Sequence, residues 1–187
     1  MIRPREMSAR RSAIGLVFVV LALLIILPPM FGWFRDDYSR FDRKSFTVES
    51  AVDGDTLILA DGRATRVALL GVDAPDLPDA HFSQHAMRYL DARLRGRRIL
   101  LKLDGTQTRD DAGRLLAYVY LGDTDLVNAD IVRDGLAYAD RRSRHTFAPQ
   151  IEQLENEART RKRGLWENLA DEQQPPWRRE WLKSRGK

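Results

Sequence analysis

The stretch RVALLGVDAPD, residues 66–76, combines a strand-like segment with a turn, and the fold is inferred from these two signals. Its apolar first half has the composition of a strand, and Gly71 and Pro75 then mark a turn. Asp73 and Asp76 lie in that turn. A strand that ends in two carboxylates predicts either a solvated bend or one edge of a polar site.

Similar strand-like segments lie on both sides of this stretch. Together they cover residues 45–52, 56–60, 65–71, 98–103 and 115–121. The Asp61-Gly62 pair is a strong hairpin signal between the second and third segments. Helical periodicity is expected from Ser83 as N-cap, over 126–134, and in a last segment before Gly164. Five short strands, one helix among them and two after them, predict an α+β fold: a five-stranded OB-fold barrel with three helices.

The composition limits the number of domains and the kinds of metal site. The chain has 187 residues, 43% of them hydrophobic, which suits one domain with appendages. We place this domain at residues 45–168. Cysteine is absent, which excludes disulfides and thiolate metal sites, so any metal must be held by oxygen or histidine.

Residues 12–34 carry no charge and are long enough to cross a bilayer as one transmembrane helix before the barrel. Four arginines precede them, so the positive-inside tendency places residues 1–11 in the cytoplasm and the domain, beyond a polar linker at 35–44, outside it. The rival interpretation is a cleaved secretory signal, which would release the domain. We predict an uncleaved single-pass membrane anchor, because no small-x-small cleavage motif follows and Trp33 and Phe34 suit the membrane interface.

The basic charge of the chain is concentrated before Arg35. Four of the 31 basic and one of the 27 acidic residues lie there, which leaves 27 basic and 26 acidic residues in the rest. The formal net charge of +4 is therefore weak evidence for a polyanionic partner.

Residues 169–187 form a basic tail in which Trp177 and Trp181 lie at helical spacing. Such a tail is able to stack on single-stranded nucleic acid or to lie on an anionic membrane surface. We predict instead that it is loosely docked or disordered.

Three side chains are candidates for a polar site. Asp55, in the turn DGDT, lies at the mouth of one strand and Asp73 at the end of another, so a hairpin register can bring them together. Two carboxylates in an oxygen-only site suit Ca²⁺ or Mg²⁺. Arg114 follows a glycine turn, and its planar fork matches a phosphate beside such a cation. Each motif also has a structural interpretation, because Asp-Gly pairs bend chains locally and Arg114 can pair with Asp110 or Asp111.

From about residue 46 to residue 166 the chain resembles the thermonuclease, or staphylococcal-nuclease-like, family. The resemblance rests on five segments in the family's order and spacing: DGDTL, LLGVDAPD, DDAGRLLAYVYL, VNADIVRDGLAYA and LENEARTRKRGLW. It implies an OB barrel with three helices and a calcium-dependent hydrolysis of phosphodiesters in DNA and RNA.

The resemblance assigns roles to several positions. Asp55 and Asp73 match two metal-ligating aspartates, and the backbone carbonyl of Ala74 matches a main-chain ligand. Arg114 matches one of two arginines that hold the phosphate. Asp76 matches a glutamate proposed to activate the attacking water, and it is one methylene shorter.

The second phosphate-binding arginine of the family is absent, because its position is Ala68. Arg66 lies on the same face of an extended strand, about 6.6 Å away, and we hypothesise that it partly replaces this arginine. Tyr118 and Tyr120 share one face of a later strand. A family tyrosine near this position can flank the nucleotide, and packing in the core or on the barrel is the alternative.

Two functions from different classes remain. The first is a membrane-tethered, Ca²⁺-dependent nuclease, monomeric and facing outward, that cleaves single-stranded DNA or RNA at a rate reduced by the loss at position 68. The second is a non-catalytic module that keeps the barrel and binds nucleic acid or a protein. Retention of Asp55, Asp73 and Arg114 favours the nuclease, since losing one donor costs about 10²–10³ in rate and need not extinguish activity.

Overall fold

The computed structural model describes residues 37–75, 81–170 and 173–186, without the side chains at 81 and 82. The chain divides into two units, Met1–Arg40 and Phe41–Lys187, and the second contains everything discussed below. The predicted membrane segment at 12–34 lies outside the described residues and stays a prediction. In the three described ranges, no helix combines the length and the apolar character needed to cross a bilayer.

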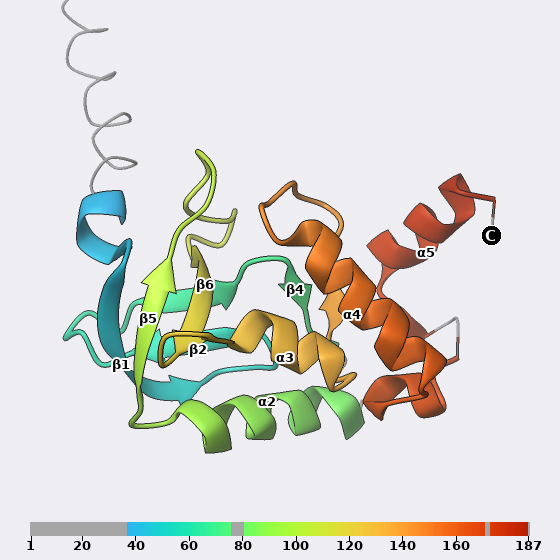
Figure 1. Cartoon of the computed structure of the whole chain (residues 1–187), viewed down its shortest axis with the longest axis horizontal. Coiled ribbons are helices and arrows are strands. Elements are labelled where there is room, and N and C mark those ends of the chain that lie inside the picture. The colour runs from blue at the N-terminus through green and yellow to red at the C-terminus, as the bar shows by residue number, and fades with distance from the viewer. Residues whose placement is uncertain (1–36, 76–80, 171–172, 187) are drawn as a thin grey trace, which may run out of the picture. The chain divides into compact units, whose positions relative to one another are not determined.

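The second unit is built on the predicted closed five-stranded barrel (Figure 1). The strands are β1 (Lys44–Ala51), β2 (Thr56–Leu59), β3 (Arg66–Leu69), β4 (Val72–Asp73), β5 (Arg98–Lys102), β6 (Leu115–Leu121), β7 (Asp125–Leu126) and β8 (Tyr138–Ala139). The main sheet has the order β3-β2-β1-β5-β6-β7, and a parallel pairing of β3 with β6 closes it. The α+β class and the OB-like barrel are thereby confirmed.

β1 belongs to both halves of the barrel. It pairs with β5 through its first half and with β2 through its second, and the register shifts between Val48 and Ser50. Val48, Leu57 and Leu101 are inward apolar side chains of these strands and are at most 1% exposed. A close-packed interior of this kind holds the strand ends at fixed positions.

The three predicted helices are α2 (His81–Leu94), α3 (Val127–Arg133) and α4 (Ala148–Thr160), and a 3₁₀ turn, η1 (Gly164–Glu167), follows them. α2 begins two residues before the cap expected at Ser83. It packs on the core through Ala86, Leu90 and Leu94, which are fully buried. Apolar spacing therefore located the helix, while its first residue was less well defined by sequence.

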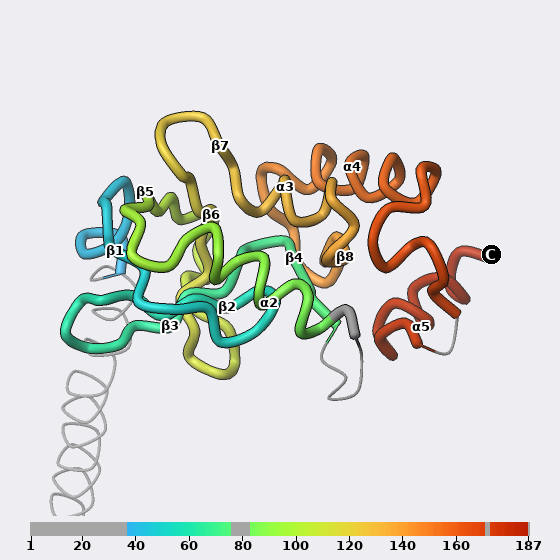
Figure 2. Tube along the Cα trace, turned by 90° about the horizontal axis from the view of Figure 1, so that it is seen from below, coloured from blue at the N-terminus to red at the C-terminus, as the bar shows by residue number. Residues whose placement is uncertain are grey.

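A fourth helix, α5 (Pro176–Ser184), corrects the prediction of a loose or disordered tail. Its anchor is Arg178, only 1% exposed, whose Nη1 and Nη2 donate to the Oε1 and Oε2 atoms of the buried Glu155 at 2.8 and 3.1 Å. An arginine buried by a bidentate carboxylate on another helix is invisible to a hydrophobic pattern. In Figures 1 and 2, β4 lies between the barrel strands and α5.

β4 and β8 form a separate two-stranded sheet, in which Asp73 pairs with Tyr138. The turn that leads into β4 is fixed by the buried Asn128 of α3. Its amide group donates to the carbonyls of Leu70 and Ala117 at 3.0 and 3.1 Å, and its Oδ1 accepts the N–H of Val119 at 2.8 Å. One fully satisfied buried amide thus ties this turn to the barrel.

Candidate functional site

The turn DGDT lies between β1 and β2. A hydrogen bond within the turn stabilises it, and the turn packs against the residue that follows β4. The Asp53 carboxylate accepts the Asp55 N–H at 3.0 Å, which is an Asx turn. A Cβ on Gly54 would lie 2.5 Å from the Cβ of Ala74 and 2.6 Å from that of Ala86. Only glycine allows this approach, so Gly54 is what brings Asp55 next to the residues that follow β4.

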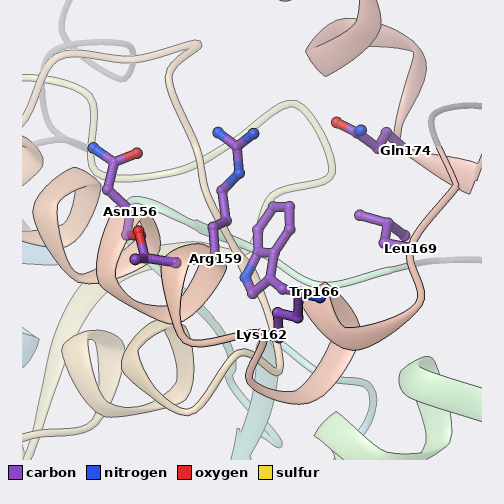
Figure 3. A pocket seen from close by; sticks show the side chains of 7 residues that line it. Asn156, Arg159, Lys162, Trp166, Leu169 and Gln174 are labelled. Atoms are coloured by element: carbon purple, nitrogen blue, oxygen red, sulfur yellow. The ribbon is translucent and has the colours of Figure 1, made fainter.

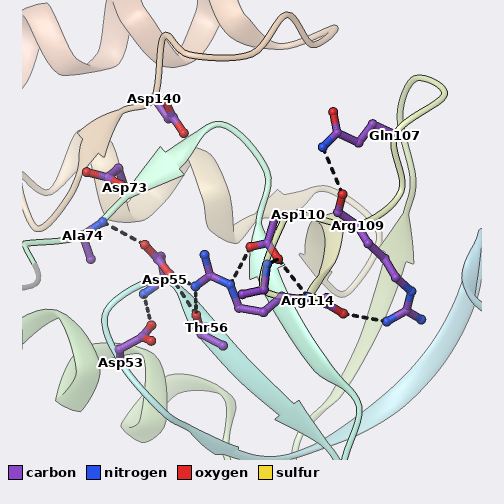
Figure 4. A network of polar contacts seen from close by, with 12 residues as sticks. Asp53, Asp55, Thr56, Asp73, Ala74, Gln107, Arg109, Asp110, Arg114 and Asp140 are labelled. Atoms are coloured by element: carbon purple, nitrogen blue, oxygen red, sulfur yellow. Dashed lines mark hydrogen bonds and ion pairs between the residues drawn. The ribbon is translucent and has the colours of Figure 1, made fainter. Parts of the chain in front are cut away.

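Asp55 binds Ala74 through its side chain (Figure 4) and Leu69, the last residue of β3, through its backbone. Its Oδ2 accepts the Ala74 N–H at 3.0 Å, and its carbonyl accepts the Leu69 N–H at 2.9 Å. Its Oδ1 accepts the Thr56 hydroxyl at 2.9 Å. Because Ala74 directly follows Asp73, the Asp55 carboxylate binds the backbone one residue beyond Asp73.

Asp73 is held by two residues that the sequence analysis did not assign to the site. Arg142 Nη2 is 2.5 Å from its Oδ1, and the indole N–H of Trp177 donates to its Oδ2 at 3.0 Å. Asp140, which follows β8, lies beside Asp73 in Figure 4. The two donors come from a loop and from α5, far along the chain from Asp73.

Both carboxylates are costly to ionise in this environment. Burial, with the charge of Asp53 adding to it, raises the pKa of Asp55 from 3.8 to about 7. Burial also raises the pKa of Asp73, in spite of the bonds from Trp177 and Arg142. A pair of carboxylates in this state favours a bound cation, because a cation restores the charged form.

Arg114 lies against Asp55. Its Nη1 is 2.7 Å from the Thr56 hydroxyl and 3.3 Å from Asp55 Oδ1. Its Nε donates to Asp110 at 2.6 Å, so it also makes the loop-closing pair that was the structural alternative. The two interpretations are compatible, since Asp110 fixes the guanidinium that reaches Asp55.

The structure places Ala68 and Arg66 differently with respect to this site. Ala68 is buried and lies opposite Thr56, next to Asp55. Arg66 is exposed at the start of β3, opposite Ile58 and two residues further along the strand. In the described part of the chain, the arginines that contact the two carboxylates are Arg114 and Arg142. The role suggested for Arg66 stays a prediction.

Tyr118 and Tyr120 lie in a buried cluster with Leu70 and Leu126. The Tyr118 hydroxyl is 3.0 Å from Asp104 Oδ2 and 2.9 Å from His145 Nδ1, and it accepts the Phe147 N–H at 3.1 Å. The Lys102 ammonium lies 4.2 Å from the centre of the Tyr120 ring.

The two tyrosine rings are 3% and 7% exposed. Their described contacts thus tie loops to β6 and do not bring the rings to Asp55 or Asp73.

Two other expected contributions concern the base and the cation. Asp76 lies outside the described residues, and its role stays a prediction. Within the described residues, no group of three or more His, Cys, Asp or Glu side chains forms a metal cluster. A cation held by Asp55 and Asp73 would complete its shell with the Ala74 carbonyl, water and substrate oxygens.

A separate pocket of about 470 Å³ lies between the end of α4, η1 and the approach to α5 (Figure 3). Its lining is polar and basic: Asn156, Arg159, Thr160, Lys162, Trp166, Leu169 and Gln174. Because none of the predicted site residues lines it, this pocket is distinct from the carboxylate pair.

Comparison with known proteins agrees with this geometry. Residues 66–168 match the family model described as staphylococcal nuclease homologue. The chain belongs to this nuclease family. The matched region includes Asp73 and Arg114, and it ends before α5.

Several curated relatives support the assignment. The chain is 29% identical to the thermonuclease of Staphylococcus intermedius over 168 residues. This aligned region covers 84% of this chain and 99% of that protein. It is 35% identical over 133 residues to an uncharacterized endonuclease of Escherichia coli, which covers 70% of this chain and 80% of that protein. A micrococcal nuclease of Shigella flexneri is 29% identical over 181 residues, which covers 90% and 95% of the two chains.

Proposed function

We propose that the protein is a Ca²⁺-dependent nuclease that hydrolyses phosphodiester bonds in single-stranded DNA or RNA. The observation that carries the proposal is the binding of the Asp55 carboxylate to the amide of Ala74, the residue after Asp73, with Arg114 against Asp55, in a chain of the nuclease family. Relatives named thermonuclease, micrococcal nuclease and endonuclease support the reaction class.

Asp55, Asp73 and the carbonyl of Ala74 are the residues that would hold the cation. They form an oxygen-only donor set, and the two buried carboxylates with raised pKa values suit a hard divalent ion. Bound Ca²⁺ would supply positive charge beside a non-bridging oxygen of the substrate phosphate.

Arg114 is proposed to hold the same phosphate. Asp110 and Thr56 already fix its guanidinium, so the cost of ordering this long side chain is met before substrate binds. Its side chain is 30% exposed, which leaves the fork open to a phosphate oxygen. Arg114 would then stabilise the negative charge that grows as the phosphorus–oxygen bond breaks.

Asp76 is proposed as the base, by the resemblance alone. It would accept a proton from the attacking water as the water oxygen bonds to phosphorus and the leaving oxygen departs. An Asp76→Asn variant that cleaves as fast as the native chain would remove this role.

We further propose that the rate is reduced by the alanine at position 68 and that residues 12–34 tether a monomeric enzyme outside the cytoplasm. The charge pattern around residues 12–34 supports the tether. Protease added to intact cells should then digest the domain, and a domain that stays protected would contradict this topology.

The test of the proposed function is cleavage of a labelled single-stranded DNA by the full chain, with Ca²⁺ and with chelator. We expect cutting only with Ca²⁺, and a loss of about 10³-fold or more in Asp55→Ala, because the cation site is destroyed. Asp111→Ala, which removes an exposed carboxylate nearby, is the matched control and should cut normally. Binding of the DNA without any cutting would instead favour the non-catalytic module.

A further inference from the structure

Both oxygens of the Asp73 carboxylate are engaged by residues from the C-terminal part of the chain. Arg142 Nη2 lies 2.5 Å from Oδ1, and the Trp177 indole N–H donates to Oδ2 at 3.0 Å. The Arg142 guanidinium also lies over the Trp177 ring, 5.0 Å from its centre. The three side chains therefore form a closed ring of contacts at the edge of the site.

Arg142 is held from a second side by Asp140. The Asp140 carboxylate accepts hydrogen bonds from Nε and Nη2 of Arg142, both at 2.9 Å. The Arg142 side chain is nevertheless 51% exposed. Ion pairs this exposed contribute little to folding, so stability alone gives a weak reason for the arrangement. Asp140 fixes one edge of the Arg142 guanidinium and the Trp177 ring covers one of its faces. The exposed remainder of the guanidinium is therefore preorganised to bind an anion.

α5 is positioned by a network that reaches the site without passing through the barrel. Arg178 of α5 donates to Glu155, and Glu155 Oε1 also accepts the N–H of Ala139 in β8 at 2.9 Å. β8 pairs with β4, which carries Asp73. Anchoring Arg178 therefore delivers its neighbour Trp177 onto Asp73.

A phosphate bound beside the cation would lie within reach of Arg142. Asp73 is one of the residues that would hold Ca²⁺, so a phosphate oxygen bound to the same ion would lie next to this carboxylate. A phosphate oxygen next to Asp73 is thus close to the guanidinium that already contacts Asp73. Arg114 has the same relation to Asp55, so each carboxylate of the pair has one arginine beside it.

We propose that Arg142 is the second phosphate-binding arginine of the site, and that Trp177 makes α5 part of the active site by positioning Arg142 and Asp73. The proposal rests on the proposed nuclease function and adds a substrate-binding residue to it. When substrate binds, Arg142 exchanges its contact with Asp73 for a phosphate oxygen, while Asp140 retains Nε.

The kinetic test compares Arg142→Ala and Arg142→Lys with the native full chain on single-stranded DNA in Ca²⁺. We expect kcat/KM to fall about 10²–10³-fold in Arg142→Ala, as for other lost transition-state donors. Arg142→Lys keeps the positive charge and loses the planar guanidinium, so its kcat/KM should fall by less. Arg144→Ala removes an exposed arginine of the same loop and should stay within about threefold of the native rate, since surface changes away from a site are usually small.

A binding test separates this proposal from the proposed function. The probes are thymidylyl-thymidine, which has one charged phosphodiester, and its neutral methylphosphonate analogue, titrated by NMR with Ca²⁺ and checked to be intact afterwards. The native chain should prefer the charged probe, and Arg142→Ala should lose about tenfold of that preference, because a hydrogen bond to a charged group is removed. Arg144→Ala should keep it. If Arg142→Ala does not fold, the preference of Arg142→Lys for the charged probe over the neutral one is compared with that of the native chain instead.

Unchanged or faster cleavage by Arg142→Ala would overturn the proposal, and faster cleavage would mark the Arg142–Trp177 pair as a plug on Asp73. An unchanged preference between the two probes would overturn it as well. If the native chain does not cut DNA but Arg142→Ala loses the phosphate preference, the nuclease function fails and the role of Arg142 stands.

Discussion

Asp55 binds the backbone of Ala74, the residue that follows Asp73, yet different parts of the chain hold the side chains of Asp55 and Asp73. Asp55 is held by Thr56 and Arg114, which belong to β2 and to the start of the β6 region. Asp73 is held by Arg142 and Trp177, which come from the loop after β8 and from α5. We call these the barrel half and the C-terminal half of the site.

The two halves differ in what fixes their side chains. The barrel half is formed by strand ends whose positions follow from the closed sheet. The C-terminal half depends on α5, which lies beyond the region that matches the family model. In the barrel half, position 68 is an alanine, which has no side-chain donor, and in the C-terminal half Arg142 lies against Asp73.

The largest effect is expected from breaking the barrel half at Arg114. Arg114→Ala should lower kcat on single-stranded DNA by about 10²–10³-fold, because a donor to the phosphate is lost. The affinity for Ca²⁺, measured by calorimetry, should change little. Arg97→Ala, an exposed arginine before β5, is the control. Normal cleavage by Arg114→Ala would show that the barrel half does not grip substrate.

The matching change in the C-terminal half is Trp177→Phe, which keeps a ring under Arg142 and removes the N–H that orients Asp73. Loss of such a supporting hydrogen bond typically costs about 10–100-fold in activity or metal affinity. Trp181→Phe makes the same change one turn later and should be nearly neutral. Equal rates for the two variants would mean that α5 contributes nothing to the site.

Gly54→Ala tests the close approach that joins the two halves. The new methyl group meets Ala74 and Ala86, so the turn must shift and the free energy of unfolding should fall by about 1–3 kcal/mol. Gly62→Ala meets open space and suffers only from its positive φ, so it should destabilise without lowering kcat. Denaturant unfolding and cleavage assays together separate the two effects. A Gly54→Ala variant as stable and active as the native chain would contradict the packing argument.

The smallest effect concerns the pH dependence of stability without a cation. The pKa of Asp55 is about 7 in the folded chain and 3.8 when unfolded, so the folded state binds more protons between these values. Stability should therefore fall as pH rises from about 4 to 7, and this loss remains above pH 7.

Asp55→Asn cannot ionise, so it does not lose stability as pH rises, but it also loses one hydrogen-bond acceptor of the carboxylate. At pH 8 in chelator the Asn variant should therefore be more stable than the native chain by about 1–2 kcal/mol. With Ca²⁺ the order should reverse, since only the native chain gains binding energy. Thermal unfolding at pH 5 and 8 checks the sign. An Asn variant that is less stable at pH 8 in chelator would contradict it.

Much of the barrel half was predictable from sequence. Strand composition, the Asp61-Gly62 turn and helical spacing are local signals, and they located the five strands and three helices. Strand order predicted that Asp55 lies near the segment after β3, and the Asp55 carboxylate does bind the backbone of Ala74, directly after β4. The pairing of Arg114 with Asp110 was one of two interpretations and is present in the structure, while the phosphate-binding role of Arg114 stays a prediction.

The C-terminal half was not predictable, for a physical reason. Its contacts join Asp73 to residues 69 and 104 positions away, and no repeating pattern marks them. α5 has Arg178 as its buried residue, whereas pattern analysis searches for apolar faces. The nearest signal was the pair of tryptophans among basic residues, which alone is equally typical of an exposed tail. Only the structure shows that Arg178 forms a bidentate pair with the buried Glu155.

The most direct test of a site shared by both halves is whether an arginine in the barrel half can replace one in the C-terminal half. Calcium-dependent cleavage of single-stranded DNA should be compared between Arg142→Ala and the double variant Arg142→Ala/Ala68→Arg, with unfolding measured for both. If both halves bind one phosphate, the double variant should recover at least about tenfold of the lost rate. A correctly folded double variant that is no faster than Arg142→Ala would contradict the account.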